Sequence, residues 1–481
     1  MLFISINFIC FFVLVFFVYY IISEKYKLIY LLLASYLFYA SFNPLFVFLL
    51  IFCSLVSWKI GLLIEELKSP ANKKYLMATG IIVILFPLLF FKYYNFINES
   101  IFWFFNLLSI PYNIPQINIL LPVGISFFTF RTLSYVVDVY KGKISAEKKI
   151  LNVSLYIAFF PQLLAGPIER APNLLPQFYK NQIFDYEGCI SGLRLVLWGV
   201  FKKIIIADRC AILVNQIYNN PHSYSGYPLI LATYFFAFQI YCDFSGYTDM
   251  ARGIARMLGF ESMENFKRPY FAKSIQEFWR RWHISLSTWF RDYVYIPLGG
   301  SRVSLPRYYF NLLIVFTVSG LWHGAGWTFI FWGFLHGFYM IFSSITSSVR
   351  KKITGALFFY KIDIIKNIIK IFITFHLVCL GWIFFRANSF LDAIYILRHF
   401  FAPLKQPLAD IPLGLDIFQI IFALMAIFVM IGVEILCEKE RLMLLWKKQK
   451  RIVRWAIYAV LVILCINFKA AVKSGFIYLQ F

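Results

Sequence analysis

Long apolar runs separated by short polar loops dominate this chain. A helix needs about 20 apolar residues to cross a bilayer, so some runs suit full spans and others suit short, tilted or re-entrant helices. The runs do not alternate apolar and polar residues, which argues against a membrane β-barrel. The pattern predicts an all-α polytopic membrane protein with roughly ten to twelve transmembrane helices. The runs are Leu2–Ile22, Leu28–Ala40, Leu45–Ile64, Leu76–Phe91, Ile117–Val139, Ile150–Leu164, Leu193–Ile206, Leu229–Cys242, Phe310–Leu321, Phe329–Ile345, Ile364–Phe385, Ile411–Leu436 and Trp455–Phe468.

The composition favours a membrane protein over a soluble one. The 481 residues are 61% hydrophobic and only 14% charged, and the mean hydropathy is +0.73. So few charges cannot cover a soluble surface of this size. The first run has no basic leader and no small-residue cleavage site, so we interpret it as a retained helix rather than a signal peptide. No linker or internal repeat divides the chain, and we expect a single membrane-embedded domain over residues 1–481.

Positive charge gathers in loops between the apolar runs. The net charge is +23, yet the linkers Ser41–Pro44 and Asn98–Gln116 contain no Lys or Arg. The positive-inside rule therefore places the N-terminus outside and the basic loops in the cytoplasm. The segments Arg252–Arg307 and Lys439–Arg454 are also basic. Membrane lipids with anionic head groups are the expected partners of these charges, and a nucleic-acid partner is not expected. Three early loops carry Lys25 and Lys27; Lys68, Lys73 and Lys74; and Lys141, Lys143, Lys148 and Lys149.

Two segments differ from simple spanning helices. Proline and glycine interrupt Leu163–Arg170, and irregular backbone at membrane depth must be covered by protein or line a cavity, so a re-entrant turn is predicted there. Farther along, aromatic and apolar side chains recur at helical spacing over Trp279–Tyr293, while the arginines fall off that face. This spacing predicts a basic amphipathic helix at the membrane interface, ended by Pro297–Gly300.

Two histidines in these apolar surroundings are candidate functional residues. His323 lies between two apolar runs, and neighbouring glycines leave room for a ligand beside its ring. A buried neutral imidazole suits a general base, although a packed structural histidine is the alternative. His283, on the predicted amphipathic helix, could orient a substrate, relay a proton or simply bind water and head groups. His336, one helix after His323, could support either ring.

Other chemical signatures are weaker or missing from the sequence. Asp243 and Asp249 end an apolar run and invite a proton-relay hypothesis. The interpretation we favour is structural, in which they anchor the helix through hydrogen bonds to Arg, Tyr or backbone N–H groups. The eight cysteines form no Cys-x-x-Cys pair, so no metal site is predicted. Neither a Gly-x-Ser-x-Gly elbow nor a phosphate-binding P-loop occurs.

Five ordered motifs make the chain resemble a known family. They occupy about residues 120–340 and are highly specific as an ordered set, whereas Trp-His-Gly alone would be weak. The chain resembles the membrane-bound O-acyltransferase (MBOAT) superfamily, specifically its bacterial branch that O-acetylates alginate and peptidoglycan. The motifs are Leu121–Phe130, Leu164–Arg170, Asp243–Asp249, Trp282–Ser287 and Trp322–Gly324.

The resemblance implies a fold and a catalytic site. Members of this family form a ring of helices around a thin central region, where a funnel from each side meets the active site. The family's catalytic histidine corresponds to His323, and its second polar position, Asn or His, corresponds to His283. An acyl thioester, acetyl-CoA, would be the donor substrate, with its phosphates attracted to a basic rim. No bound cofactor or metal is implied.

The resemblance also implies an acceptor, partners and a location. The acetyl group would cross the bacterial cytoplasmic (inner) membrane for O-acetylation of an envelope or extracellular polysaccharide. Its acceptor would be a sugar, or a serine of an extracytoplasmic SGNH-type acetyltransferase or esterase, and we favour the latter. The alternatives are D-alanyl transfer to teichoic acid and, in a different class, a transporter or flippase of an envelope precursor. The polymer, a covalent acyl-enzyme and the oligomeric state stay open.

Overall fold

The computed structural model describes residues 1–164, 166–356, 362–405, 407, 411–438, 449–468 and 475–477. Every regular element in these residues is a helix, which confirms the all-α prediction. They form two compact units, which we call unit 1 (residues 1–196 and 251–263) and unit 2 (residues 197–250 and 264–481). Helices α10 (Tyr186–Phe201) and α12 (Tyr227–Met257) contribute residues to both. Most of the basic segment Lys439–Arg454 lies outside the described residues.

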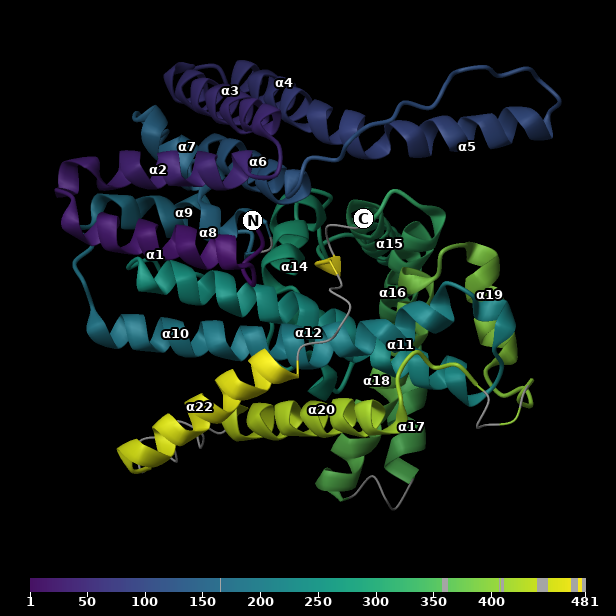
Figure 1. The fold of residues 1–481 in the computed structure, drawn as a ribbon. Helices are drawn as coiled ribbons and strands as arrows, with labels where there is room; N and C mark the ends of the chain where they lie inside the picture. The colour runs from purple at the N-terminus through teal and green to yellow at the C-terminus, as the bar shows by residue number, and fades with distance from the viewer. Residues whose placement is uncertain are drawn as a thin grey trace. The chain divides into compact units, whose positions relative to one another are not determined.

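Unit 1 contains the first nine helices of the chain (Figure 1). Helix α3 packs against α4, α6 and α7. A π-helical turn, Leu89–Tyr93, joins α4 to α5 just after Pro87 and Leu88 end α4. Helix α5 extends away from α3 in Figure 1. The helices are α1 (Ile6–Ile21), α2 (Glu24–Ala40), α3 (Val47–Glu66), α4 (Pro70–Leu88), α5 (Tyr94–Leu107), α6 (Ile125–Tyr140), α7 (Ile150–Ala158), α8 (Phe160–Leu163) and α9 (Ala171–Leu174).

Unit 2 contains the remaining helices, among which α15 and α16 form a closely packed hairpin. Helix α16 also packs against α18 and α13, and the fully buried Trp282, Trp332 and Trp382 lie in this region. These helices are α11 (Asp208–Tyr218), α13 (Ile275–Arg281), α14 (Ile284–Phe290), α15 (Leu305–His323), α16 (Trp327–Ile345), α17 (Ser347–Ala356), α18 (Asp363–Arg386), α19 (Phe390–His399), α20 (Ile417–Glu438) and α22 (Arg451–Asn467).

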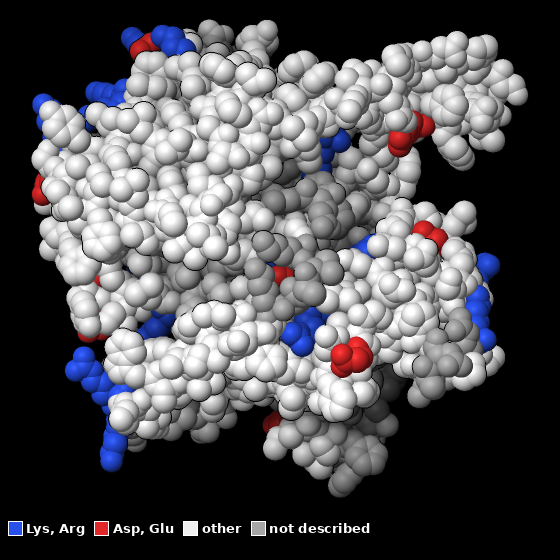
Figure 2. All heavy atoms as spheres, viewed as in Figure 1, with Lys and Arg blue, Asp and Glu red and all other residues white. Residues whose placement is uncertain are grey.

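Six described helical segments are long and apolar enough to cross a membrane. Large apolar side chains are exposed on them, such as Phe48 at 67% and Phe418 at 80%, and charged side chains are sparse on the face shown in Figure 2. Such faces suit lipid tails. A multi-pass membrane protein is therefore supported, while the number of ten to twelve spans stays a prediction, since α1 has only 16 residues. The six segments are Pro44–Glu66, Pro70–Leu107, Tyr227–Met257, Trp327–Ile345, Asp363–Arg386 and Ile417–Leu436.

The single amphipathic helix predicted over Trp279–Tyr293 is wrong. Helix α13 ends at Arg281, Trp282 is extended, and His283 has left-handed dihedrals (φ 43°, ψ 55°) before α14 begins at Ile284. The Trp282 ring of the predicted apolar face is buried in unit 2, where it lies 5.0 Å from Trp382. Hydrophobic spacing could not reveal the break, because both short helices keep their apolar residues buried.

The chain is irregular between Leu163 and Ala171 in unit 1, whereas a re-entrant course in the membrane stays a prediction. Helix α8 ends at Leu163 and α9 begins at Ala171, with Ala165 between them outside the described residues. The hydroxyl of the fully buried Tyr156 donates to the carbonyl oxygen of Glu169 at 2.9 Å, which satisfies a backbone group within this irregular segment. The turn is therefore held by protein groups.

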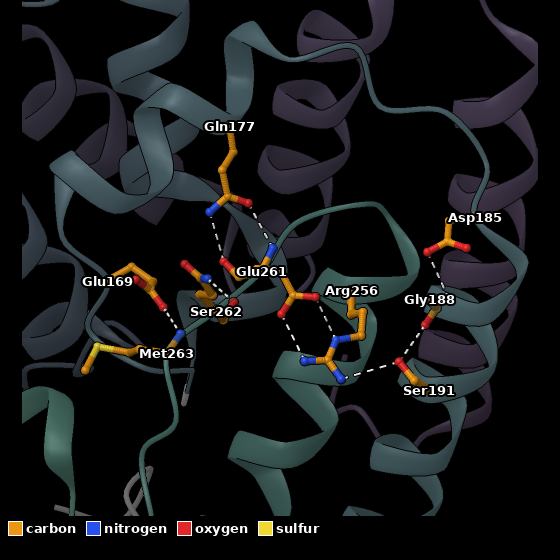
Figure 3. Close-up of polar contacts among 10 residues, drawn as sticks. Glu169, Gln177, Asp185, Gly188, Ser191, Arg256, Glu261, Ser262 and Met263 are labelled. Atoms are coloured by element: carbon orange, nitrogen blue, oxygen red, sulfur yellow. Dashed lines mark hydrogen bonds and ion pairs between the residues drawn. The ribbon is translucent and has the colours of Figure 1, made fainter.

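This turn also anchors the loop after α12. In Figure 3, the Glu169 carboxylate accepts a hydrogen bond from the backbone N–H of Met263. Close by, the side chain of Gln177 accepts from the Glu261 N–H at 2.9 Å and donates to the Glu261 carbonyl oxygen at 3.0 Å. The motif Leu164–Arg170 thus has a structural task within unit 1.

Candidate active site

The α15–α16 hairpin positions His323. Glycines let the two helices touch through their backbones: a Cβ on Gly320 would lie 2.2 Å from the carbonyl oxygen of Phe329, and one on Gly333 would lie 2.2 Å from that of Phe316. Such close approach requires small residues at the contact. His323 is the last residue of α15 and is only 2% exposed.

Aromatic rings surround His323. Its ring centroid lies 5.0 Å from those of Trp322 and Trp332 and 5.6 Å from that of Phe385. These rings keep bulk water away from the imidazole. His323 is therefore a buried imidazole with aromatic neighbours.

His283 occupies the turn between α13 and α14 in a strained conformation. A non-glycine residue at φ 43° is uncommon and costs of order 1–3 kcal/mol, so its surroundings must hold it there. The side chain is fully buried, and the ring of Phe244 lies 4.6 Å away at 85°. Burial lowers the pKa of His283 from 6.5 to about 3, which keeps the imidazole neutral at physiological pH.

Asn265 holds this turn. Its backbone carbonyl accepts from the N–H of Ile284 at 2.9 Å. Its side-chain Oδ1 accepts from the N–H of Ser285 at 3.1 Å and from the Ser285 hydroxyl at 2.8 Å. The same Oδ1 lies 3.2 Å from Nδ1 of His283. Asn265, Ser285 and His283 are all fully buried, so these contacts form away from bulk water.

The structure brings the two predicted site histidines together. The ring centroids of His283 and His323 lie 6.4 Å apart, with planes at 67°, and both rings contact Trp322. His336 also lies nearby: it accepts a hydrogen bond from Trp279 Nε1 at 3.3 Å, and its ring lies 5.1 Å from Trp332, which in turn contacts His323. The arrangement is a buried pair of imidazoles with an aromatic wall.

The acidic pair at the end of the apolar run is anchored by lysines. In unit 2, Lys203 Nζ lies 2.7 Å from Asp243 and 2.8 Å from Asp208. The backbone N–H of Ile477 also donates to Asp243, and Lys202 pairs with Asp249. These contacts support the structural interpretation of the aspartates, with Lys and backbone N–H groups as the partners.

Sequence reasoning missed several of these groups. Lys202 and Lys203 lie inside an apolar run. Because charged residues in such runs usually pair, these lysines could have predicted ion pairs with the aspartates. Asn265 lies outside any motif or periodic segment, and no sequence pattern links it to His283. Only the fold reveals that contact.

Comparisons with known proteins identify the family of this chain. The sequence model of the membrane-bound O-acyltransferase family, MBOAT, matches residues 144–383, which include His283, His323 and Asn265. The probable alginate O-acetylase AlgI of Pseudomonas aeruginosa is 39% identical over 381 residues, covering 77% of this chain and 69% of that protein. This chain belongs to the membrane-bound O-acyltransferase family. The chain is accordingly a multi-pass O-acyltransferase of the membrane, as the motifs implied.

Two further relatives place the chain within the MBOAT family. The peptidoglycan O-acetyltransferase of Helicobacter pylori is 35% identical over 398 residues, or 77% of this chain and 73% of the relative. The teichoic acid D-alanyltransferase of Bacillus subtilis is 27% identical over 363 residues, or 70% of this chain and 85% of the relative. By identity, this MBOAT chain is more similar to the two O-acetylating relatives than to this D-alanyl-transferring one.

Proposed function

We propose that this enzyme moves an acetyl group from cytoplasmic acetyl-CoA to a hydroxyl on the outer side of the bacterial inner membrane. The acceptor is a serine of an extracytoplasmic SGNH-type transferase, which then O-acetylates an envelope or extracellular polysaccharide. The observation that carries this proposal is the buried pair of His323 and His283, 6.4 Å apart, in a chain similar to alginate and peptidoglycan O-acetylating proteins.

In this proposal His323 is the general base. It takes the proton of the acceptor hydroxyl while the hydroxyl oxygen attacks the thioester carbonyl carbon. The carbon–sulfur bond of the tetrahedral intermediate then breaks, and the thiolate leaves with the proton that His323 had accepted. The surrounding rings of Trp322 and Trp332 exclude water, which would otherwise hydrolyse the thioester.

Identity supports acetyl transfer over D-alanyl transfer. The relatives named for O-acetylation are 35% and 39% identical, against 27% for the D-alanyltransferase. The transporter alternative gains no support from these relatives, whose names denote group-transfer enzymes. A transporter would also give no functional reason for burying His283 beside His323.

Orientation follows from the charge pattern. The lysine-rich loops face the cytoplasm, and the Lys-free and Arg-free linker Asn98–Gln116 faces outward together with the N-terminus. Anionic lipids neutralise the basic loops. The outward side is where the partner transferase would meet the enzyme.

The deciding experiment measures O-acetyl content in purified envelope polymers of a deletion strain. The strain is complemented with the wild-type gene or with His323→Ala, and protein abundance is matched by immunoblotting. Acetate that returns with wild type and not with His323→Ala supports the proposal and names the polymer. Full restoration by His323→Ala would refute the catalytic role. Unchanged acetate throughout would favour D-alanine as the transferred group, which the same polymer samples can be assayed for.

A further inference from the structure

We propose that Asn265 is a positioning residue that sets the tautomer of His283, so that His283 presents an unprotonated Nε2 to the acyl-transfer site. The inference rests on the proposed function only in its kinetic consequence, because the tautomer itself is a property of the folded protein. Asn265 would thereby determine which hydrogen bonds His283 can make.

Hydrogen-bond donors around Asn265 determine the orientation of its side-chain amide. A backbone N–H can only donate, and the N–H of Ser285 lies 3.1 Å from Oδ1 of Asn265. The opposite rotamer would turn the amide NH₂ toward that N–H, two donors against each other, in a fully buried place. The Ser285 hydroxyl also reaches the same oxygen, at 2.8 Å. The amide oxygen therefore faces the His283 turn.

The tautomer of His283 follows from that oxygen. Nδ1 of His283 lies 3.2 Å from Oδ1 of Asn265, and a carbonyl oxygen can only accept. Nδ1 must then carry the proton and donate. A neutral imidazole has a single N–H, so the other nitrogen, Nε2, holds a lone pair. Burial lowers the pKa of His283 to about 3, which keeps the ring neutral and agrees with this assignment.

Asn265 fixes the backbone as well as the ring. Its carbonyl accepts from the N–H of Ile284, the residue after the strained His283, at 2.9 Å. The buried Asn265 thus binds the backbone after His283, at Ile284 and Ser285, and also contacts the His283 imidazole. Partners of this kind orient a functional imidazole, and their loss typically costs about 10–100-fold in activity or affinity.

This division of tasks is chemically consistent. In the proposed function His323 takes the proton of the acceptor, whereas burial keeps His283 neutral. With its lone pair on Nε2, His283 accepts a hydrogen bond from an O–H or N–H group of a substrate. It orients that group beside His323 without itself taking the proton.

The direct test is the ¹⁵N NMR spectrum of the full-length protein in lipid bilayers with ¹⁵N-labelled histidine. The His283 signals are assigned by their loss in His283→Asn. The proposal expects a protonated Nδ1 and an unprotonated Nε2 in the wild type, and a changed tautomer ratio in Asn265→Leu. A wild-type His283 protonated at Nε2 would overturn it. So would an unchanged ratio in a folded Asn265→Leu protein.

Steady-state kinetics of Asn265 variants provide a second test. Asn265→Leu should lower kcat for acetyl transfer about 10–100-fold and leave KM for the thioester within about twofold. Asn265→Asp keeps an acceptor oxygen and should recover most of kcat, while its negative charge favours a protonated His283 and moves the acid limb of the pH profile upward. If Asn265→Asp has the activity and pH profile of Asn265→Leu, the positioning role is refuted.

A matched control separates positioning from folding. Asn311 is also fully buried and donates to the carbonyl oxygens of Leu298 and Gly300 at 3.1 and 3.2 Å, away from His283. Asn311→Leu should lower stability and leave the His283 tautomer and the pH profile unchanged. Absence of acyl transfer by the wild type would refute the proposed function alone, because the NMR test does not depend on turnover.

Discussion

The imidazole rings of His283 and His323 lie 6.4 Å apart although 40 residues separate them in the chain. One ring sits in a strained turn held by Asn265, and the other ends a long helix. Burial lowers the pKa of the first, His283, which keeps that ring neutral. The pair therefore places a neutral, hydrogen-bonding imidazole beside the proposed general base.

Replacing His323 should abolish acyl transfer without unfolding the protein. We expect His323→Gln to lower the rate of acetyl transfer by about 10²–10⁴-fold, the usual contribution of a general base. The measurement is release of free thiol from acetyl-CoA by purified enzyme in proteoliposomes with the acceptor present. His222→Gln is the control, since the His222 side chain is 62% exposed, and it should retain full activity. A His323→Gln enzyme with half the wild-type rate would contradict the assignment.

Two replacements of His283 should differ in their effect. Asparagine tolerates a left-handed backbone and can present an amide oxygen as acceptor, so His283→Asn should keep activity within about tenfold of wild type. Leucine has neither property, and His283→Leu should lose about 100-fold or more. The same thiol-release assay compares them at equal abundance. Equal losses in both variants would contradict a role limited to accepting a hydrogen bond in a left-handed turn.

The free energy of unfolding should decrease as the pH is lowered from 6.5 toward 3, because of His283. Below pH 6.5 the imidazole of the unfolded chain takes up a proton, whereas the folded one stays neutral down to about pH 3. The unfolded state then binds more protons, so falling pH destabilises the fold by at most about 1.4 kcal/mol per pH unit from this group. Denaturation midpoints in mild detergent between pH 7 and pH 4 should show a shallower slope for His283→Asn. Parallel slopes would argue against the lowered pKa.

Removing Lys203 should be strongly destabilising. Lys203→Met leaves Asp208 and Asp243 as buried carboxylates without their shared cation, at a cost of about 3–5 kcal/mol. Lys366→Met is the control, because that lysine and Asp363 form a surface pair that contributes about 0–1 kcal/mol. Adding Asp243→Asn to Lys203→Met should recover part of the stability. Thermal denaturation in detergent would reveal equal losses in the two lysine variants if the cluster were unimportant.

The glycine contact between α15 and α16 should control the position of His323. Gly333→Ala places a Cβ 2.2 Å from the Phe316 carbonyl oxygen, so the helices must separate, at about 1–3 kcal/mol. Activity should fall with stability, because the displaced helix carries His323. Gly432→Ala meets nothing within 4 Å and should be neutral or stabilising by up to about 1 kcal/mol. A Gly333→Ala enzyme as stable and active as Gly432→Ala would contradict the close packing.

The sequence by itself determined the architecture and the candidate histidines. Long apolar runs can be satisfied only as helices in a membrane, and five ordered motifs indicated the family and both His283 and His323. Two lysines within an apolar run could also have indicated the charge cluster with Asp243, since buried charges need partners.

Only the tertiary structure decided how the site is built. Apolar spacing predicted one helix through His283, but a period of 3.6 residues cannot register a single left-handed residue between two buried helical turns. The partner that allows this turn, Asn265, comes from a loop with no pattern of its own. Contacts between residues distant in sequence depend on how the helices pack. Packing is determined by many side chains together, so no single segment predicts it.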